Sequence, residues 1–377
     1  FSLSFALLAY EVVLLRILAY LQWYHFAYMV ISLALLGFGA SGTLMHIFRP
    51  FWERHFARSF EAALILTAVT MAAVKPLLAI IPTDVFIAIW QPWQLWGLIA
   101  LCLVLFLPFL CGAFGIILVL SRTPGKIAVY YGANLAGSGT GALAGILLLY
   151  LWHPLAIPRI LALLITVAVA LFALSNQLRG RSRHQARAFP AALAPSIIGA
   201  AAVVILGWGI ALNPAMSQYK ALSRARQLPA TDVLLEGYSP LGVADLVQGP
   251  TLRAAAGLSL SYQGTIRPQI AAFIDGNPVG VVPLLDDTSA GAPLRHTSQA
   301  LAYRVRFAPD DDGNAKQVLV LNAGPGSEVH QALMHGGSSV TAVVRDGKLL
   351  DMLGHLSGIK AGSGDVYTDP RVKTVVA

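Results

Sequence analysis

The sequence predicts a multi-spanning α-helical membrane bundle over residues 1–212, followed by an α/β domain. The first observation is composition: 56% of the residues are hydrophobic and 12% are charged, whereas soluble domains carry about 25% charged residues. The second is the succession of long apolar runs in the first 212 residues. The third is an alternation of short apolar strands and helical stretches near the C-terminus, which is typical of a parallel sheet.

Seven apolar stretches are long enough to cross the hydrocarbon core, which needs about 20 residues per helix. We therefore predict about seven transmembrane helices, at 2–20, 26–48, 60–82, 96–121, 127–151, 156–175 and 192–212.

Positive charge alternates between the connecting loops. The loops after the second, fourth and sixth spans hold nine basic residues, whereas the opposite loops hold almost none. By the positive-inside rule the basic loops are cytoplasmic, and with seven spans residue 213 lies on the opposite side. A miscounted span would reverse this side, so the side of residues 213–377 stays open. The nine basic residues are Arg49, Arg54, Arg58, Arg122, Lys126, Arg179, Arg181, Arg183 and Arg187.

Glu11, Arg16, Lys75 and Asn134 are polar residues inside the predicted spans. A charge in hydrocarbon costs about 2.5–3.5 kcal/mol on insertion scales, so such residues have partners or a function. Lys75 is a candidate partner for Glu11. A transport pathway and structural pairing are both open interpretations.

Glycines also recur within the apolar runs. The run 37–42 matches GxGxxG, but no strand precedes it, so the context excludes a dinucleotide site. Gly137, Gly141 and Gly145 are spaced by four on one helix face. We interpret both sets as sites of close helix packing.

After residue 212 the texture changes to a polar linker over 213–235 and a small β region over 236–310. Strands are expected at 242–248, 258–262 and 270–274, separated by Gly, Pro and Asp turns. Residues 213–377 hold 14 basic and 14 acidic residues, and this balance argues against a nucleic-acid partner. The acidic run at 310–312 is interpreted as a solvated turn, and no metal site is predicted.

A βαβ pattern begins at about residue 311 and continues to 377. Strands are predicted at 318–321, 340–344 and 372–376, with helices at 327–336 and 347–356 between them. A parallel sheet of three strands cannot bury both faces well, so we expect this domain to be truncated here.

The glycine-rich turn between the first strand and helix is the strongest chemical signal. Glycines after a strand let the backbone approach a ligand, and the next helix offers free N–H groups. We therefore expect cofactor binding at Asn322, Gly324, Gly326 and Ser327. Val344 occupies the position where an acid normally meets the ribose, and Asp346 could substitute for it. A degenerate domain without cofactor is the alternative.

Several segments together resemble the spermidine synthase family of aminopropyltransferases. The membrane half is similar to multi-spanning bacterial proteins that fuse a helical bundle to such a domain. The turn departs from the family pattern at Asn322, Ala323 and Pro325, and the family's ribose-binding Glu falls on Val344. The resembling segments are 318–328, 340–343, 367–372, 239–242 and 273–276.

The resemblance implies a Rossmann-like domain of the SAM-methyltransferase type. It implies S-adenosylmethionine or its decarboxylated form as cofactor, and Asp275 and Tyr303 as substrate-binding positions. The expected function is a membrane-bound transferase that alkylates a small amine or related acceptor, in a bacterial inner membrane. The alternative is a membrane transporter or sensor with a non-catalytic domain. The lipid bilayer is the expected partner, and homo-oligomer formation is left open.

Overall fold

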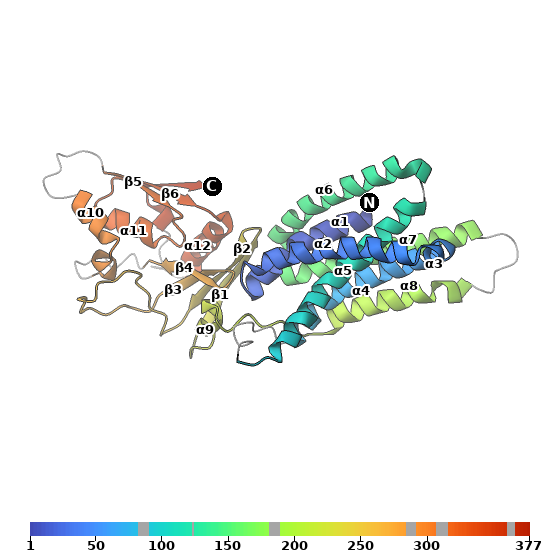
Figure 1. Ribbon diagram of the computed structural model, residues 1–377. Helices are drawn as coiled ribbons and strands as arrows, with labels where there is room; N and C mark the ends of the chain where they lie inside the picture. The colour runs from blue at the N-terminus through green and yellow to red at the C-terminus, as the bar shows by residue number, and fades with distance from the viewer. Residues whose placement is uncertain (82–89, 123, 181–188, 284–291, 307–315, 360–365) are drawn as a thin grey trace. The chain divides into compact units, whose positions relative to one another are not determined.

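A computed structural model describes the chain except for residues 82–89, 123, 181–188, 284–291, 307–315 and 360–365 (Figure 1). The chain divides into two compact units, which are described separately. The membrane unit comprises Phe1–Ser217, and the α/β unit comprises Gln218–Ala377.

Six helices of the membrane unit are long and apolar enough to cross a membrane. They confirm the first six predicted spans and make this a multi-pass membrane protein by length and composition. Short helical segments connect some of them, namely α3 (Arg49–Arg54), η1 (Pro124–Lys126) and η2 (Pro154–Ala156). The six helices are α1 (Ser2–Leu21), α2 (Phe26–Ile47), α4 (Phe56–Ile80), α5 (Gln94–Arg122), α6 (Ile127–Leu151) and α7 (Ile157–Gly180).

The seventh predicted span, 192–212, differs from the other six. It corresponds to α8 (Phe189–Val204) and a π-helical turn, η4 (Ile205–Gly209). Its described apolar helix, Ala194–Gly209, is shorter than the other spans. The helix ends at a Gly-Trp-Gly sequence, where two glycines weaken helical propensity.

Helix α1 is the most buried helix of the bundle, and α6 packs closely along it. A Cβ added to Gly137 would lie 2.5 Å from the Phe1 carbonyl oxygen, and one on Gly141 would overlap the Phe5 backbone. Gly145 meets the Ala9 backbone in the same way. The predicted packing role of these three glycines is confirmed.

The second glycine set gives a mixed result. Gly37 of α2 packs against Phe109 of α5, whereas a Cβ on Gly39 or Gly42 would meet nothing within 4 Å. Only the first glycine of the run therefore serves close packing, because the other two lie on a different part of the helix surface.

The α/β unit begins with the short helix α9 (Ala221–Ala225) and a four-stranded antiparallel sheet in the order β1-β2-β3-β4. The predicted strand at 258–262 is wrong. That segment forms turns, and its only β contact among the described residues is an isolated bridge from Leu258 to Thr297. Leu260 is fully exposed, so the apolar alternation there faces no core. The strands are β1 (Asp232–Ser239), β2 (Gly242–Gln248), β3 (Ile270–Ile274) and β4 (Asn277–Val282).

The second sheet is parallel, in the order β5-β6-β7, and its strands follow the predicted ones within a residue. Its strands are β5 (Gln317–Leu321), β6 (Ser339–Val344) and β7 (Val372–Val376). The helical segments are η5 (Pro293–His296), α10 (Ala300–Arg306), α11 (Ser327–Met334), α12 (Gly347–Ile359) and η6 (Val366–Thr368).

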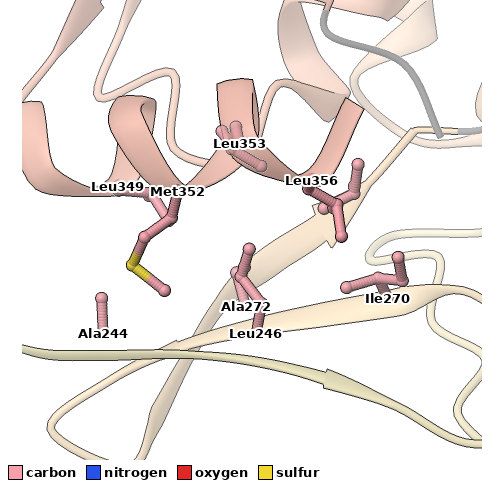
Figure 2. Close-up of a cluster of buried hydrophobic side chains, with 9 residues drawn as sticks. Ala244, Leu246, Ile270, Ala272, Leu349, Met352, Leu353 and Leu356 are labelled. Carbon is pink, nitrogen blue, oxygen red and sulfur yellow. The ribbon is translucent and has the colours of Figure 1, made fainter. Parts of the chain in front are cut away.

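Helix α12 joins the two sheets of this unit into one structure. It follows β6 of the parallel sheet, yet its apolar face packs on the antiparallel sheet. Figure 2 shows its side chains directed at those of β2 and β3. The small β region therefore shares a core with the βαβ segment. The cluster consists of Ala244, Leu246, Ile270, Ala272, Val282, Leu349, Met352, Leu353 and Leu356.

Candidate ligand-binding site at the glycine-rich turn

The turn between β5 and α11 has the backbone geometry that the sequence predicts. Asn322, Gly324 and Gly326 have φ angles of 54°, 51° and 102°, in the left-handed region that glycine adopts at little cost. Asn is among the few other residues that tolerate it. These three positions turn the chain sharply from the strand into the helix.

One side of the turn is covered by η6. The Tyr367 hydroxyl donates to the carbonyl oxygens of Ala323 and Gly324, at 3.1 and 2.7 Å. A Cβ on Gly326 would lie 2.5 Å from the Val366 side chain. Because Gly326 has no side chain, Val366 can pack directly against the turn.

The other side of the turn is covered by β4. The Ser327 hydroxyl donates to the Val281 carbonyl oxygen at 2.5 Å. A Cβ on Gly280 would lie 2.9 Å from Pro325, which is one of the departures from the family pattern. The proline thus packs on a strand of the antiparallel sheet.

Asp346, the predicted substitute for the ribose-binding acid, is 5% exposed and has two structural partners. The Ser239 hydroxyl donates to Oδ2 at 2.8 Å, and the Lys348 backbone N–H donates to Oδ1 at 2.9 Å. The carboxylate therefore links β1 to the first turn of α12. Val344, at the position that the family's acid would occupy, is buried.

A small cavity lies next to the turn. Arg267, Gln269, Val281, Ser327 and His330 contribute to its lining, and its volume is about 30 Å³. That space holds about one water molecule, whereas sites for cofactor-sized ligands measure about 300–1,000 Å³. Among the described residues, this cavity is therefore much smaller than a typical cofactor site.

The two predicted substrate-binding residues contact different elements. Asp275 has a φ of 48° in the turn between β3 and β4, and its Oδ1 accepts from the Val243 backbone N–H at 3.0 Å. Tyr303 lies on α10 and stacks on His335 with a ring distance of 5.2 Å. Burial, with the charge of Glu328, raises the pKa of Tyr303. Asp275 therefore contacts β2, whereas Tyr303 contacts the ring of His335.

A cluster of buried charged residues in the α/β unit was not predicted from the sequence. Lys220 is fully buried and donates to the Asp275 carbonyl oxygen, and burial lowers the pKa of Lys220 to about 8. Arg226 forms an ion pair of 2.9 Å with the fully buried Asp245. Both cations lie in the segment interpreted as a polar linker. The available signal was Asp245, a lone acid inside an apolar strand.

Asp245 makes the folding stability of the α/β unit depend on pH. Burial raises the pKa of Asp245 from 3.8 to about 7. The charge of Arg226 opposes this rise, and the charge of Glu236 on β1 adds to it. The folded state therefore binds this proton more tightly, and folding free energy is lost as pH rises from about 4 to 7. We expect Asp245→Asn to gain stability relative to the parent across this window, by up to about 4 kcal/mol. Unfolding of the α/β unit at pH 5 and pH 8 measures roughly 3 kcal/mol of this difference, because about two pH units of the window lie between these values.

The control for this prediction is Asp232→Asn, which changes an exposed carboxylate of β1 that lies opposite Gln248 rather than Asp245. Its relative stability should change little between the two pH values. An Asp245→Asn advantage that is equal at pH 5 and pH 8 would contradict the assignment.

Two hydrogen bonds link polar residues of different helices in the membrane unit. Ser4 of α1 donates to the Asn134 amide oxygen of α6 at 2.7 Å. Ser196 of α8 donates to Glu61 of α4 at 2.6 Å. Glu61 is a further polar residue, which the sequence analysis did not single out. These pairs act as interhelical contacts.

The predicted Glu11–Lys75 pair is not formed by the described residues. Glu11 is partly buried on α1, and Lys75 is partly buried on α4. The reason is the arrangement of helices, since α1 packs mainly on α6, α2 and α7, while α4 packs on α5, α7 and α8. Arg16 is also partly buried on α1.

No group of three or more potential metal ligands occurs among the residues that the structure describes. The acidic run at 310–312 lies outside them. Cys102 and Cys111 are both free thiols on α5.

Comparison with known proteins finds no match for this chain among family models, curated proteins or solved structures.

Proposed function

We propose that this chain is a multi-pass membrane transporter or sensor whose α/β unit is a spermidine synthase-like domain without transferase activity. One observation carries the proposal. The glycine-rich turn, where a sulfonium nucleoside would lie, is occupied by the chain's own residues on two sides.

A bound nucleoside would have to displace hydrogen bonds that Tyr367 and Asp346 make within the chain. Tyr367 would give up the hydrogen bond that its single hydroxyl proton shares between two carbonyl oxygens of the turn, worth about 1 kcal/mol net. Asp346 would leave two partners, and the separation of a buried carboxylate from its donors costs more, about 1.5–3 kcal/mol per bond. Because these contacts hold α12 and η6 in place, binding would require part of the core to move.

A second candidate function is the membrane-bound transferase that uses S-adenosylmethionine or its decarboxylated form. The observation in its favour is the conformation of the turn, with three left-handed residues between a parallel strand and a helix N-terminus. Such a turn positions backbone N–H groups for a ligand. This candidate requires η6 and Tyr367 to move away on binding.

Titration calorimetry on the purified full-length protein separates the two candidates. We expect no saturable heat with either sulfonium compound up to about 1 mM, a limit that corresponds to about −4 kcal/mol of binding free energy. Saturable binding that Gly326→Ala abolishes and Gly336→Ala preserves would show that the turn takes the ligand and would remove the observation on which the first candidate rests. Both glycines have positive φ, but only Gly326 belongs to the turn.

A further inference from the structure

The side of the membrane on which the α/β unit lies depends on whether α8 crosses the membrane. With six crossings the unit follows the arginine-rich loops on their side, and with seven it lies opposite them. The contacts of α8 within the membrane unit locate both of its ends.

The first end of α8 lies at the level of the arginine-rich loops. Ser196 donates to Glu61 at 2.6 Å, and Glu61 stands in the second turn of α4. That helix begins at Phe56, two residues after Arg54. The start of α8 therefore lies beside the start of α4.

The middle of α8 continues along α4 in the same direction. A Cβ on Gly199 would lie 2.7 Å from the Ile65 side chain. Ser196 meets Glu61 and Gly199 meets Ile65, so residue numbers rise together in the two helices. Helix α8 therefore runs parallel to α4, which is itself a long apolar crossing.

The turn η4, which follows α8, lies at the opposite face of the membrane unit. The Arg159 guanidinium lies over the Trp208 ring at 5.1 Å, and a Cβ on Gly207 would lie 3.2 Å from the Arg159 Cβ. Arg159 is the third residue of α7, which starts on the side where α6 ends.

The chain beyond η4 stays at that face. The Ser217 backbone N–H donates to the carbonyl oxygen of Leu21, the last residue of α1, at 2.8 Å. Tyr20 of α1 contacts the His153 ring between α6 and α7 at 5.2 Å. The end of α1, the α6–α7 connection and Ser217 thus share one side.

The length of the segment agrees with a crossing. Helix α8 has 16 residues and η4 has five, and at about 1.5 Å per residue they extend for roughly 30 Å. This is the thickness of the hydrocarbon core, about 30 Å.

We propose that α8 and η4 form a seventh membrane crossing and that Gln218–Ala377 faces the non-cytoplasmic side. The basic sequence segments 49–58, 122–126 and 179–187 mark the cytoplasmic side by their charge. Any ligand of the α/β unit is then a solute of the non-cytoplasmic compartment. The inference stands on the membrane unit alone and does not depend on the proposed function.

Cysteine labelling of the full chain in intact cells tests this side. In a background with Cys102→Ser and Cys111→Ser, single cysteines are placed at three exposed positions: Gln227→Cys in the α/β unit, Gln91→Cys before α5, and Gly125→Cys in the loop with Lys126. A membrane-impermeant maleimide should label Gln227→Cys and Gln91→Cys in intact cells. It should label Gly125→Cys only after permeabilisation.

Labelling of Gln227→Cys only after permeabilisation, as for Gly125→Cys, would overturn the inference. If the cysteine variants do not accumulate, reporters fused after Ala377 of the unmodified chain give the answer. Active alkaline phosphatase with dark green fluorescent protein supports the seventh crossing, and the reverse result overturns it. Neither readout depends on a ligand, so failure here is distinct from failure of the proposed function.

Discussion

Replacement of Gly141 by valine is expected to separate α6 from α1 and to prevent accumulation of the folded protein. A Cβ at this position would overlap the backbone of Phe5, and a backbone atom cannot rotate away as a side chain can. Overpacking of a tight interface costs about 1–3 kcal/mol, and more where the obstacle is rigid. We expect a loss of more than about 3 kcal/mol, measured as yield of monodisperse protein and as Tm in detergent.

Gly139→Val is the matched control, because it lies on the same helix and a Cβ there would meet nothing within 4 Å. It introduces the same side chain and the same helix propensity, so it should leave yield and Tm almost unchanged. Equal losses for the two variants would contradict the described α1–α6 packing.

Gly326→Ala is expected to destabilise the α/β unit by about 3 kcal/mol. A residue with a side chain at φ of 102° bears a conformational cost of about 1–3 kcal/mol, and its Cβ would lie 2.5 Å from Val366. Hydrogen exchange of β5 and α11 in the full-length protein measures the loss as faster exchange of protected amides.

Gly336→Ala separates the two contributions. Gly336 has a φ of 87°, and a Cβ on it would meet nothing within 4 Å. Gly336→Ala should lower the stability of the α/β unit only by the conformational cost of a positive φ, about 1 kcal/mol. If Gly326→Ala is no worse than Gly336→Ala, then Val366 does not fill the space over the turn.

Hydropathy predicted the six long helices because the bilayer imposes a single strong requirement on length and polarity. The same rule predicted a seventh span at 192–212, but the helix there is shorter than the others and is followed by the π-helical turn η4, which contains Gly207 and Gly209. Contacts with Glu61 and Arg159, far away in sequence, supply the information that hydropathy lacks.

In the α/β unit, the parallel strands were predicted because each is an apolar run bounded by turns. The edge strands β1 and β4 were missed, because their mixed polarity gives little periodic signal. The candidate site shows the same limit. The glycine turn was visible in the sequence, but its occupation by Tyr367 was not, and neither was the bond from Ser239 to Asp346.

These long-range contacts change the interpretation of the turn. Glycines near a strand end serve either a ligand or the protein's own packing, and local sequence does not distinguish the two uses. Here Gly326 accommodates Val366, Gly280 accommodates Pro325, and Asp346 holds Ser239. The glycines at and beside this turn therefore serve the chain's own packing.

The most direct test of the central claim is a transfer assay on the full-length protein in detergent, where both faces are accessible. Radiolabelled S-adenosylmethionine and its decarboxylated form are incubated separately with a mixture of small amines. We predict no consumption of either compound above that of a protein-free control. Consumption that depends on the protein and is lost in Gly326→Ala, but kept in Gly336→Ala, would show that the domain is a working transferase.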